Sequence, residues 1–176
     1  MSIIKSLDSI ALDIATHIKN VVPDHPSSIN VLKHGIAVVI NTASIILLTI
    51  GISLLTGQVQ GAILAMLSFS LLRQVVGGIH LKSSMVCIIV STVLLTALSF
   101  ANLNHNLIVV TSILSTILVL LYGPSRIEGK TRIPKRYYPL LKACGVALIA
   151  LNLWLGLPVV SASFFVQSLT LIRRRL

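Results

Sequence analysis

Residues 35–56 read GIAVVINTASIILLTIGISLLT, a run that contains no charged side chain. As a helix, a run of this length is long enough to cross the roughly 30 Å hydrocarbon core of a bilayer. The whole chain shares this character, because 55% of its 176 residues are hydrophobic and only 10% are charged. Soluble domains usually carry about a quarter charged residues. The sequence therefore predicts an integral membrane protein rather than a soluble domain.

Further apolar runs follow at 59–72, 85–100, 107–122, 140–156 and 159–172. With the first run they predict an all-α, polytopic protein in which 35–172 form a bundle of about six short transmembrane helices. No separate soluble domain fits beside this bundle, so 1–176 are expected to form a single domain. Several runs are shorter than the roughly 20 residues that a span needs. These segments must borrow flanking residues or lie where the membrane is thin or filled with water.

Residues 1–22 differ from these runs, because their apolar side chains recur at helical spacing rather than continuously. Ile3, Leu7, Ile10 and Ile14 fall on one helical face. The segment 22–28, VPDHPSS, then ends the helix with two prolines. This pattern predicts an amphipathic helix that lies along the membrane surface and remains in the mature protein. The alternative is a helix that packs on loops of its own protein.

The distribution of positive charge predicts the orientation in the membrane. The chain has 14 Lys and Arg residues and a net charge of +10. If both termini are cytoplasmic, all of them fall on the inner side, including those of the basic tail 173–176. The outer connections, 56–58, 101–106 and 156–158, carry none, as the positive-inside rule requires.

This charge is explained by orientation and by attraction to anionic lipid, so nucleic acid is not implied as a partner. The loop 123–142 is denser in basic residues than orientation alone needs. A second interpretation of that loop is therefore a surface that receives an acidic peptide.

Several kinds of chemistry lack the residues that they need. The four acidic residues all lie outside the apolar runs, which argues against an intramembrane aspartyl protease and against a transporter built on a buried acid. No histidine-rich metal motif occurs, and no metal or cofactor is expected. The cysteines Cys87 and Cys144 belong to no paired framework, so we expect no disulfide. Cys144 is interpreted as a small, inert helix residue.

The stretch RQVVGGIHLKSSMVC, Arg73 to Cys87, is where a nucleophile, a base and cationic side chains coincide. His80 is a base that can take the thiol proton of Cys87, and Arg73 and Lys82 supply positive charge that favours a thiolate. On one straight helix His80 and Cys87 would stand about 10.5 Å apart along the axis, too far for a hydrogen bond. The helix must therefore break, for which Gly77-Gly78 is suited, or the histidine must come from elsewhere.

A plainer interpretation also fits these residues. Gly77-Gly78 is then an ordinary cytoplasmic turn, His80 an interfacial side chain and Cys87 an inert core thiol. Residue chemistry alone leaves both interpretations open.

The spacing of Arg73, Gly77-Gly78, His80 and Cys87, R-x3-GG-x-H-x6-C, resembles the signature of the accessory gene regulator B family of bacterial membrane cysteine peptidases. The amphipathic first segment, the six apolar runs and the basic loop extend this likeness over nearly the whole chain. The resemblance implies that His80 and Cys87 are catalytic. It also implies cleavage of a quorum-sensing pro-peptide at its C-terminal side through an acyl-enzyme thioester, with assisted closure of a thiolactone or lactone ring.

The resemblance further implies a small amphipathic pro-peptide with an acidic tail as substrate. A homodimer, in which His80 and Cys87 of different protomers would be able to pair, is also expected. The expected location is the bacterial cytoplasmic membrane with the active site toward the cytoplasm. Candidate residues for contact with the substrate are Arg73, Gly77, Gly78, Lys82, Arg126, Lys130, Arg132, Lys135 and Arg136.

Two other classes of protein compete with the peptidase. The first is a non-catalytic membrane protein that binds or exports an anionic peptide or lipid, in which Cys87 would be inert. The second is a thiol oxidoreductase, which is disfavoured because the chain has no C-x-x-C pair and Cys144 lies on a different segment.

Overall fold

The computed structural model describes residues 7–79, 83–125 and 134–172, apart from the side chain of Lys135. Within these ranges the chain forms seven α-helices, one short 3-10 helix and no β-strand. The helices are α1 (Leu7–Val21), α2 (Ile29–Thr56), α3 (Val59–Val76), α4 (Ser84–Ser99), α5 (His105–Tyr122), α6 (Tyr138–Leu155) and α7 (Pro158–Leu169), with the 3-10 helix η1 (Lys135–Tyr137) before α6. The prediction of an all-α protein is therefore confirmed.

Each predicted apolar run corresponds to one of the helices α2 to α7, and local residues set the helix ends. The side chains of Ser28 and Asn104 accept hydrogen bonds from backbone N–H groups at the starts of α2 and α5. Gly57 and Gly156 adopt left-handed backbone conformations at the ends of α2 and α6. Both are ordinary helix-capping devices, which satisfy backbone groups that the helix leaves unpaired.

Length separates the helices into two groups. Four of them, α2, α3, α5 and α6, are long and apolar enough to cross a membrane. The other two apolar helices have 16 residues in α4 and 12 in α7. At 1.5 Å per residue α7 is only about 18 Å long, well short of a bilayer core. The chain is thus a membrane protein, while the count of six spans remains a prediction.

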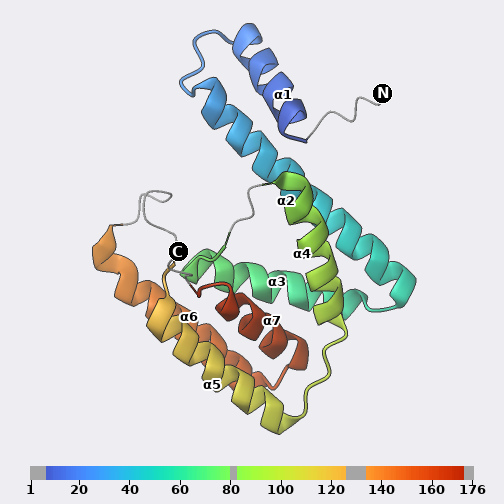
Figure 1. Cartoon of the computed structure of the whole chain (residues 1–176), viewed down its shortest axis with the longest axis vertical. Coiled ribbons are helices and arrows are strands. Elements are labelled where there is room, and N and C mark those ends of the chain that lie inside the picture. The colour runs from blue at the N-terminus through green and yellow to red at the C-terminus, as the bar shows by residue number, and fades with distance from the viewer. Residues whose placement is uncertain (1–6, 80–82, 126–133, 173–176) are drawn as a thin grey trace.

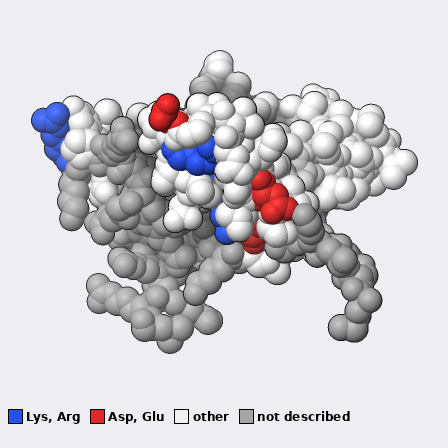
Figure 2. All heavy atoms as spheres, turned by 90° about the horizontal axis from the view of Figure 1, so that it is seen from above, with Lys and Arg blue, Asp and Glu red and all other residues white. Residues whose placement is uncertain are grey.

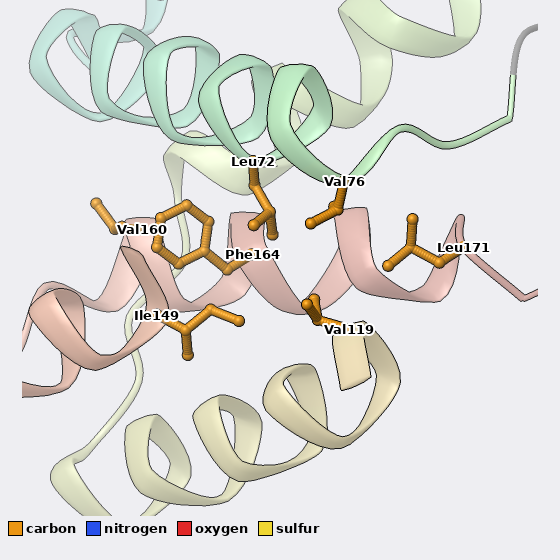
Figure 3. Close-up of a cluster of buried hydrophobic side chains, with 7 residues drawn as sticks. All are labelled: Leu72, Val76, Val119, Ile149, Val160, Phe164 and Leu171. Carbon is orange, nitrogen blue, oxygen red and sulfur yellow. The ribbon is translucent and has the colours of Figure 1, made fainter. Parts of the chain in front are cut away.

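The shortest helix, α7, lies inside the bundle rather than at its edge. Figure 1 shows it beside α3, α5 and α6, and half of its residues are buried. Its apolar side chains meet those of α3, α5 and α6 in the core cluster of Figure 3, which comprises Leu72, Val76, Val119, Ile149, Val160, Phe164 and Leu171. Because other helices cover α7, it is not required to match the thickness of the lipid.

The N-terminal helix α1 packs against α2, and Figure 1 shows the two side by side. Ala11 and Ala15 on its inner face are fully buried. Ile10 and Ile14 of the predicted apolar face remain exposed. One face of α1 therefore packs on its own protein. Because other apolar side chains of α1 remain exposed, its location along the membrane surface stays a prediction.

The two ends of the bundle differ in charge. At one end Gly57 and Asn102, from two of the predicted outer connections, line a shallow pocket of about 460 Å³ together with Val159, which directly follows the third. The opposite end holds Arg73 in the last turn of α3 and Arg136 in η1. In Figure 2 the side on which α2 ends presents a broad surface without charged side chains. This asymmetry agrees with the charge pattern of the sequence, and the cytoplasmic placement of the basic end is a prediction.

Cysteine accessibility tests that placement. In a background with Cys87→Ser and Cys144→Ser, we expect Asn102→Cys to react with a membrane-impermeant maleimide in intact cells. Arg136→Cys, which is also at an exposed position, should react only after lysis if the basic end faces the cytoplasm as predicted. The reverse pattern would contradict the predicted orientation.

Candidate active site

Cys87 lies in the first turn of α4. This helix begins at Ser84, because Ser83 before it has an extended backbone (φ −96°, ψ 126°) and acts as its N-cap. The Cys87 side chain is half-buried, and its Sγ lies 3.9 Å from the Ser91 Oγ one turn further along. The first turn of a helix favours negative charge, since its unpaired N–H groups point toward the N-terminus.

The chain breaks its helix between Arg73 and Cys87, as the sequence predicted. The helix α3 ends at Val76, and both following glycines have positive φ, 79° at Gly77 and 145° at Gly78. His80 and Lys82 lie outside the described residues. Because Ser83 is extended, the helix that carries Cys87 does not continue back toward His80. The pairing of His80 with Cys87 stays a prediction.

Position 78 requires a glycine for two reasons, the absence of a side chain and the backbone conformation. A Cβ at this position would lie 2.7 Å from the Thr170 Oγ1 and 2.9 Å from the Gln167 Nε2. Other residues rarely adopt such a φ, and there is no room for a methyl group against α7. The second glycine of the pair thus allows the end of α7 to approach the backbone closely.

Three backbone carbonyls around this turn each accept a hydrogen bond from a different part of the chain. The Val76 oxygen accepts from the Ser125 N–H at 2.9 Å, and the Gly77 oxygen accepts from the Gln167 Nε2 at 2.6 Å. The Ile79 oxygen accepts from the Arg73 guanidinium. Backbone groups that are buried outside a helix need such partners, because water does not reach them. We call residues 76–79 the glycine turn.

Arg73 links the glycine turn to the thiol. Besides its bond to Ile79, its guanidinium is near enough to Cys87 for an electrostatic interaction. The predicted apolar run ends at residue 72, but Arg73 still lies in the last turn of α3 and is half-buried. Val75 and Val76 continue the helix past it, so the apolar run ends before the helix does.

The predicted substrate-binding basic residues are only partly described. Arg126, Lys130 and Arg132 lie outside the described residues, as does the side chain of Lys135. The Arg136 guanidinium lies 4.8 Å from the centre of the Tyr137 ring and donates a hydrogen bond to its hydroxyl at 3.0 Å. A peptide-binding role for this basic loop stays a prediction.

Other side chains that could react with a substrate or bind a metal are not part of this site. Cys144 is exposed on α6, away from any described thiol partner. Across the described ranges, no group of three or more His, Cys, Asp or Glu side chains is arranged to hold a metal ion.

Sequence reasoning missed the partners of the glycine turn: Ser125, Gln167 and Thr170. One signal was available, since Gln167 is an amide within the apolar run 159–172, and a polar side chain at membrane depth is costly unless it is bonded. Its partner, 90 residues away, follows from no local pattern.

Comparison with known proteins gives one family. The model of the family described as Accessory gene regulator B matches residues 10–172. A curated relative named "Putative AgrB-like protein", from Halalkalibacterium halodurans, is 29% identical over 100 residues, which are 57% of this chain and 51% of the relative. The chain thus spans about half the length of that relative. No solved structure matches the chain.

Proposed function

Because the chain belongs to the accessory gene regulator B family, we propose that it is a membrane cysteine endopeptidase that cleaves a quorum-sensing pro-peptide. Membership of this family suggests involvement in the processing of such peptides. The observation that supports a cysteine mechanism is the position of Cys87, in the first turn of α4 and within range of an electrostatic interaction with the Arg73 guanidinium. A helix start and a nearby cation are the surroundings in which nucleophilic cysteines are commonly found.

In the proposed reaction the Cys87 sulfur attacks the scissile carbonyl of the pro-peptide. The C–N bond breaks, and the N-terminal part stays on the enzyme as a thioester while the C-terminal part leaves as an amine. His80, whose catalytic role is implied by the resemblance to the family signature, takes the thiol proton and passes it to the leaving amine. A cysteine or serine of the substrate then attacks the thioester, which closes a thiolactone or lactone ring and returns the Cys87 thiol.

Ring closure competes with hydrolysis of the thioester by water. Cys87 is half-buried, so a bound peptide would cover much of its remaining surface. Restricting water at a reactive acyl group protects it until an internal nucleophile arrives. The half-buried thiol therefore favours transfer to the substrate's own side chain.

The proposed substrate carries an amphipathic leader and an acidic tail. The tail would meet the basic end of the bundle, where Arg126, Lys130, Arg132, Lys135 and Arg136 follow α5 in sequence. The leader and the exposed apolar face of α1 would both lie in the surface of an anionic membrane. A cytoplasmic active site and a homodimer belong to the same proposal.

A trapped acyl-enzyme tests the reaction directly. The protein, reconstituted in liposomes, is mixed with a candidate substrate, a small amphipathic peptide with an acidic tail, and its intact mass is followed. We expect an adduct of the peptide's N-terminal part on Cys87 that hydroxylamine removes, because thioesters react with this nucleophile. Binding or transport of the intact peptide, with neither adduct nor released tail, would instead support the binding or export protein.

A further inference from the structure

We propose that Gln167 of α7 is a positioning residue for the reaction at Cys87. In this role its amide holds the Gly77 carbonyl, and thereby fixes the glycine turn from which Arg73 and the thiol take their relative position. The catalytic part of this inference rests on the proposed function. Its structural part concerns the Cys87 thiol alone and is testable without a substrate.

The first support is the free-energy cost of burying the Gln167 amide among apolar side chains. Gln167 has no exposed surface, and α7 packs its apolar residues into the core cluster. Its Nε2 donates to the Gly77 oxygen at 2.6 Å, while its Oε1 is buried without a described partner. Burying an amide with one group unpaired costs free energy that an apolar side chain of the same size would avoid. The hydrogen bond to the Gly77 oxygen is the one described interaction of the Gln167 amide that offsets this cost.

The second support is the weakness of the turn without this bond. Gly77 and Gly78 are the residues with the greatest backbone freedom, and neither has a side chain to pack. The Gly77 oxygen has Gln167 as its donor among the described residues. The nearby contact of Gly78 with Gln167 and Thr170 is steric only. Loss of the Gln167 donor would leave the Gly77 oxygen without a described donor and loosen the turn on the side of α7. The bond from the Gly77 N–H to the Arg73 oxygen and the bridge with Ser125 would remain.

The third support is the short path from the turn to the thiol. Two residues after Gly77, the Ile79 carbonyl accepts from Arg73, and Arg73 interacts electrostatically with Cys87. A displaced turn would move the acceptor that anchors the guanidinium. The charge beside the sulfur would then be less well fixed, although neither Arg73 nor Cys87 is changed.

Asn152 of α6 provides a matched control. It is also a buried amide, with its Nδ2 donating to the Leu157 oxygen at 3.4 Å and its Oδ1 without a described partner. Its bond lies at the other end of the bundle, where α6 joins α7. Replacement of either amide by an apolar residue removes the same chemistry, but only Gln167 touches the glycine turn.

The experiment uses the full chain with Cys144→Ser, so that Cys87 is the one remaining thiol. Gln167→Met keeps the length and packing of the side chain and removes its donor. We expect the thermal unfolding temperature to change little, since one unpaired polar atom, the Gln167 Oε1, is removed while another, the Gly77 oxygen, loses its donor. The rate at which N-ethylmaleimide labels Cys87 should nevertheless change severalfold. Asn152→Leu should leave that rate close to the parent's.

With the pro-peptide, Gln167→Met should lower kcat by about 10- to 100-fold and leave KM nearly unchanged, because a small misplacement of reacting groups is costly. Labelling and kcat at parental values would overturn the inference, and so would an equal response to Asn152→Leu. If the parent cleaves no peptide but labelling depends on Gln167, the proposed function fails while the positioning of the thiol stands.

Discussion

Replacing Cys87 with serine is expected to lower kcat for pro-peptide cleavage by at least about a thousandfold, since a catalytic nucleophile is lost. His80→Ala should have an effect of similar size, because the thiol then lacks its base and the leaving amine its acid. Binding of the peptide should persist in both variants. The measurement is the release of the C-terminal fragment by protein in liposomes, at peptide concentrations above and below KM.

Cys144→Ser is the matched control for this pair of variants. Its thiol is exposed on α6, and nothing in the described structure connects it to the glycine turn. We expect cleavage by this variant at the parental rate. Parental cleavage by both Cys87→Ser and His80→Ala would end the cysteine peptidase assignment and favour a binding or export protein.

Gly78→Ala is expected to reduce cleavage by about 100-fold, the loss that a displacement of about 1 Å causes in an active site. The new methyl carbon would lie 2.7 Å from the Thr170 Oγ1, and its backbone would have to keep a φ of 145°. A non-glycine residue in such a conformation costs about 1–3 kcal/mol. The turn should therefore shift, and both the cleavage rate and the unfolding temperature should fall.

Gly51→Ala serves as the comparison. Gly51 lies in α2, where an added Cβ would meet nothing within 4 Å, and alanine is favoured over glycine in a helix by about 1 kcal/mol. Cleavage should be unchanged and stability retained. Adding Thr170→Ser to Gly78→Ala would remove a methyl group at residue 170 but keep the hydroxyl that lies too close to the new Cβ. The second substitution should therefore not restore cleavage. Wild-type cleavage by Gly78→Ala would show that the turn tolerates another conformation.

Much of the helical framework follows from the sequence. The run 35–56 and the later apolar runs all form helices, and Gly57 and Gly156 end two of them. The break after Val76 was predicted because two glycines precede a histidine and a cysteine that one helix would keep apart. These are local features, which composition and spacing express directly.

The arrangement of the helices did not follow from the sequence. Hydropathy does not distinguish an apolar helix that faces lipid from one that faces other helices, so the central place of α7 was not foreseen. The bond from Gln167 to Gly77 joins residues 90 positions apart, and no periodic pattern reports such a contact. The position of His80, the homodimer, the lipid contacts and the orientation of the termini stay predictions.

The central place of α7 also has a consequence for biosynthesis. During translation α7 is made after α3, α5 and α6, so these helices enter the membrane before the helix that joins them exists. Until α7 arrives, the Gly77 carbonyl lacks its Gln167 donor and the core cluster lacks Val160 and Phe164. Under the positioning role proposed for Gln167, a nascent or truncated chain would carry the Cys87 thiol without its support, and the order of synthesis itself would delay the reactive state.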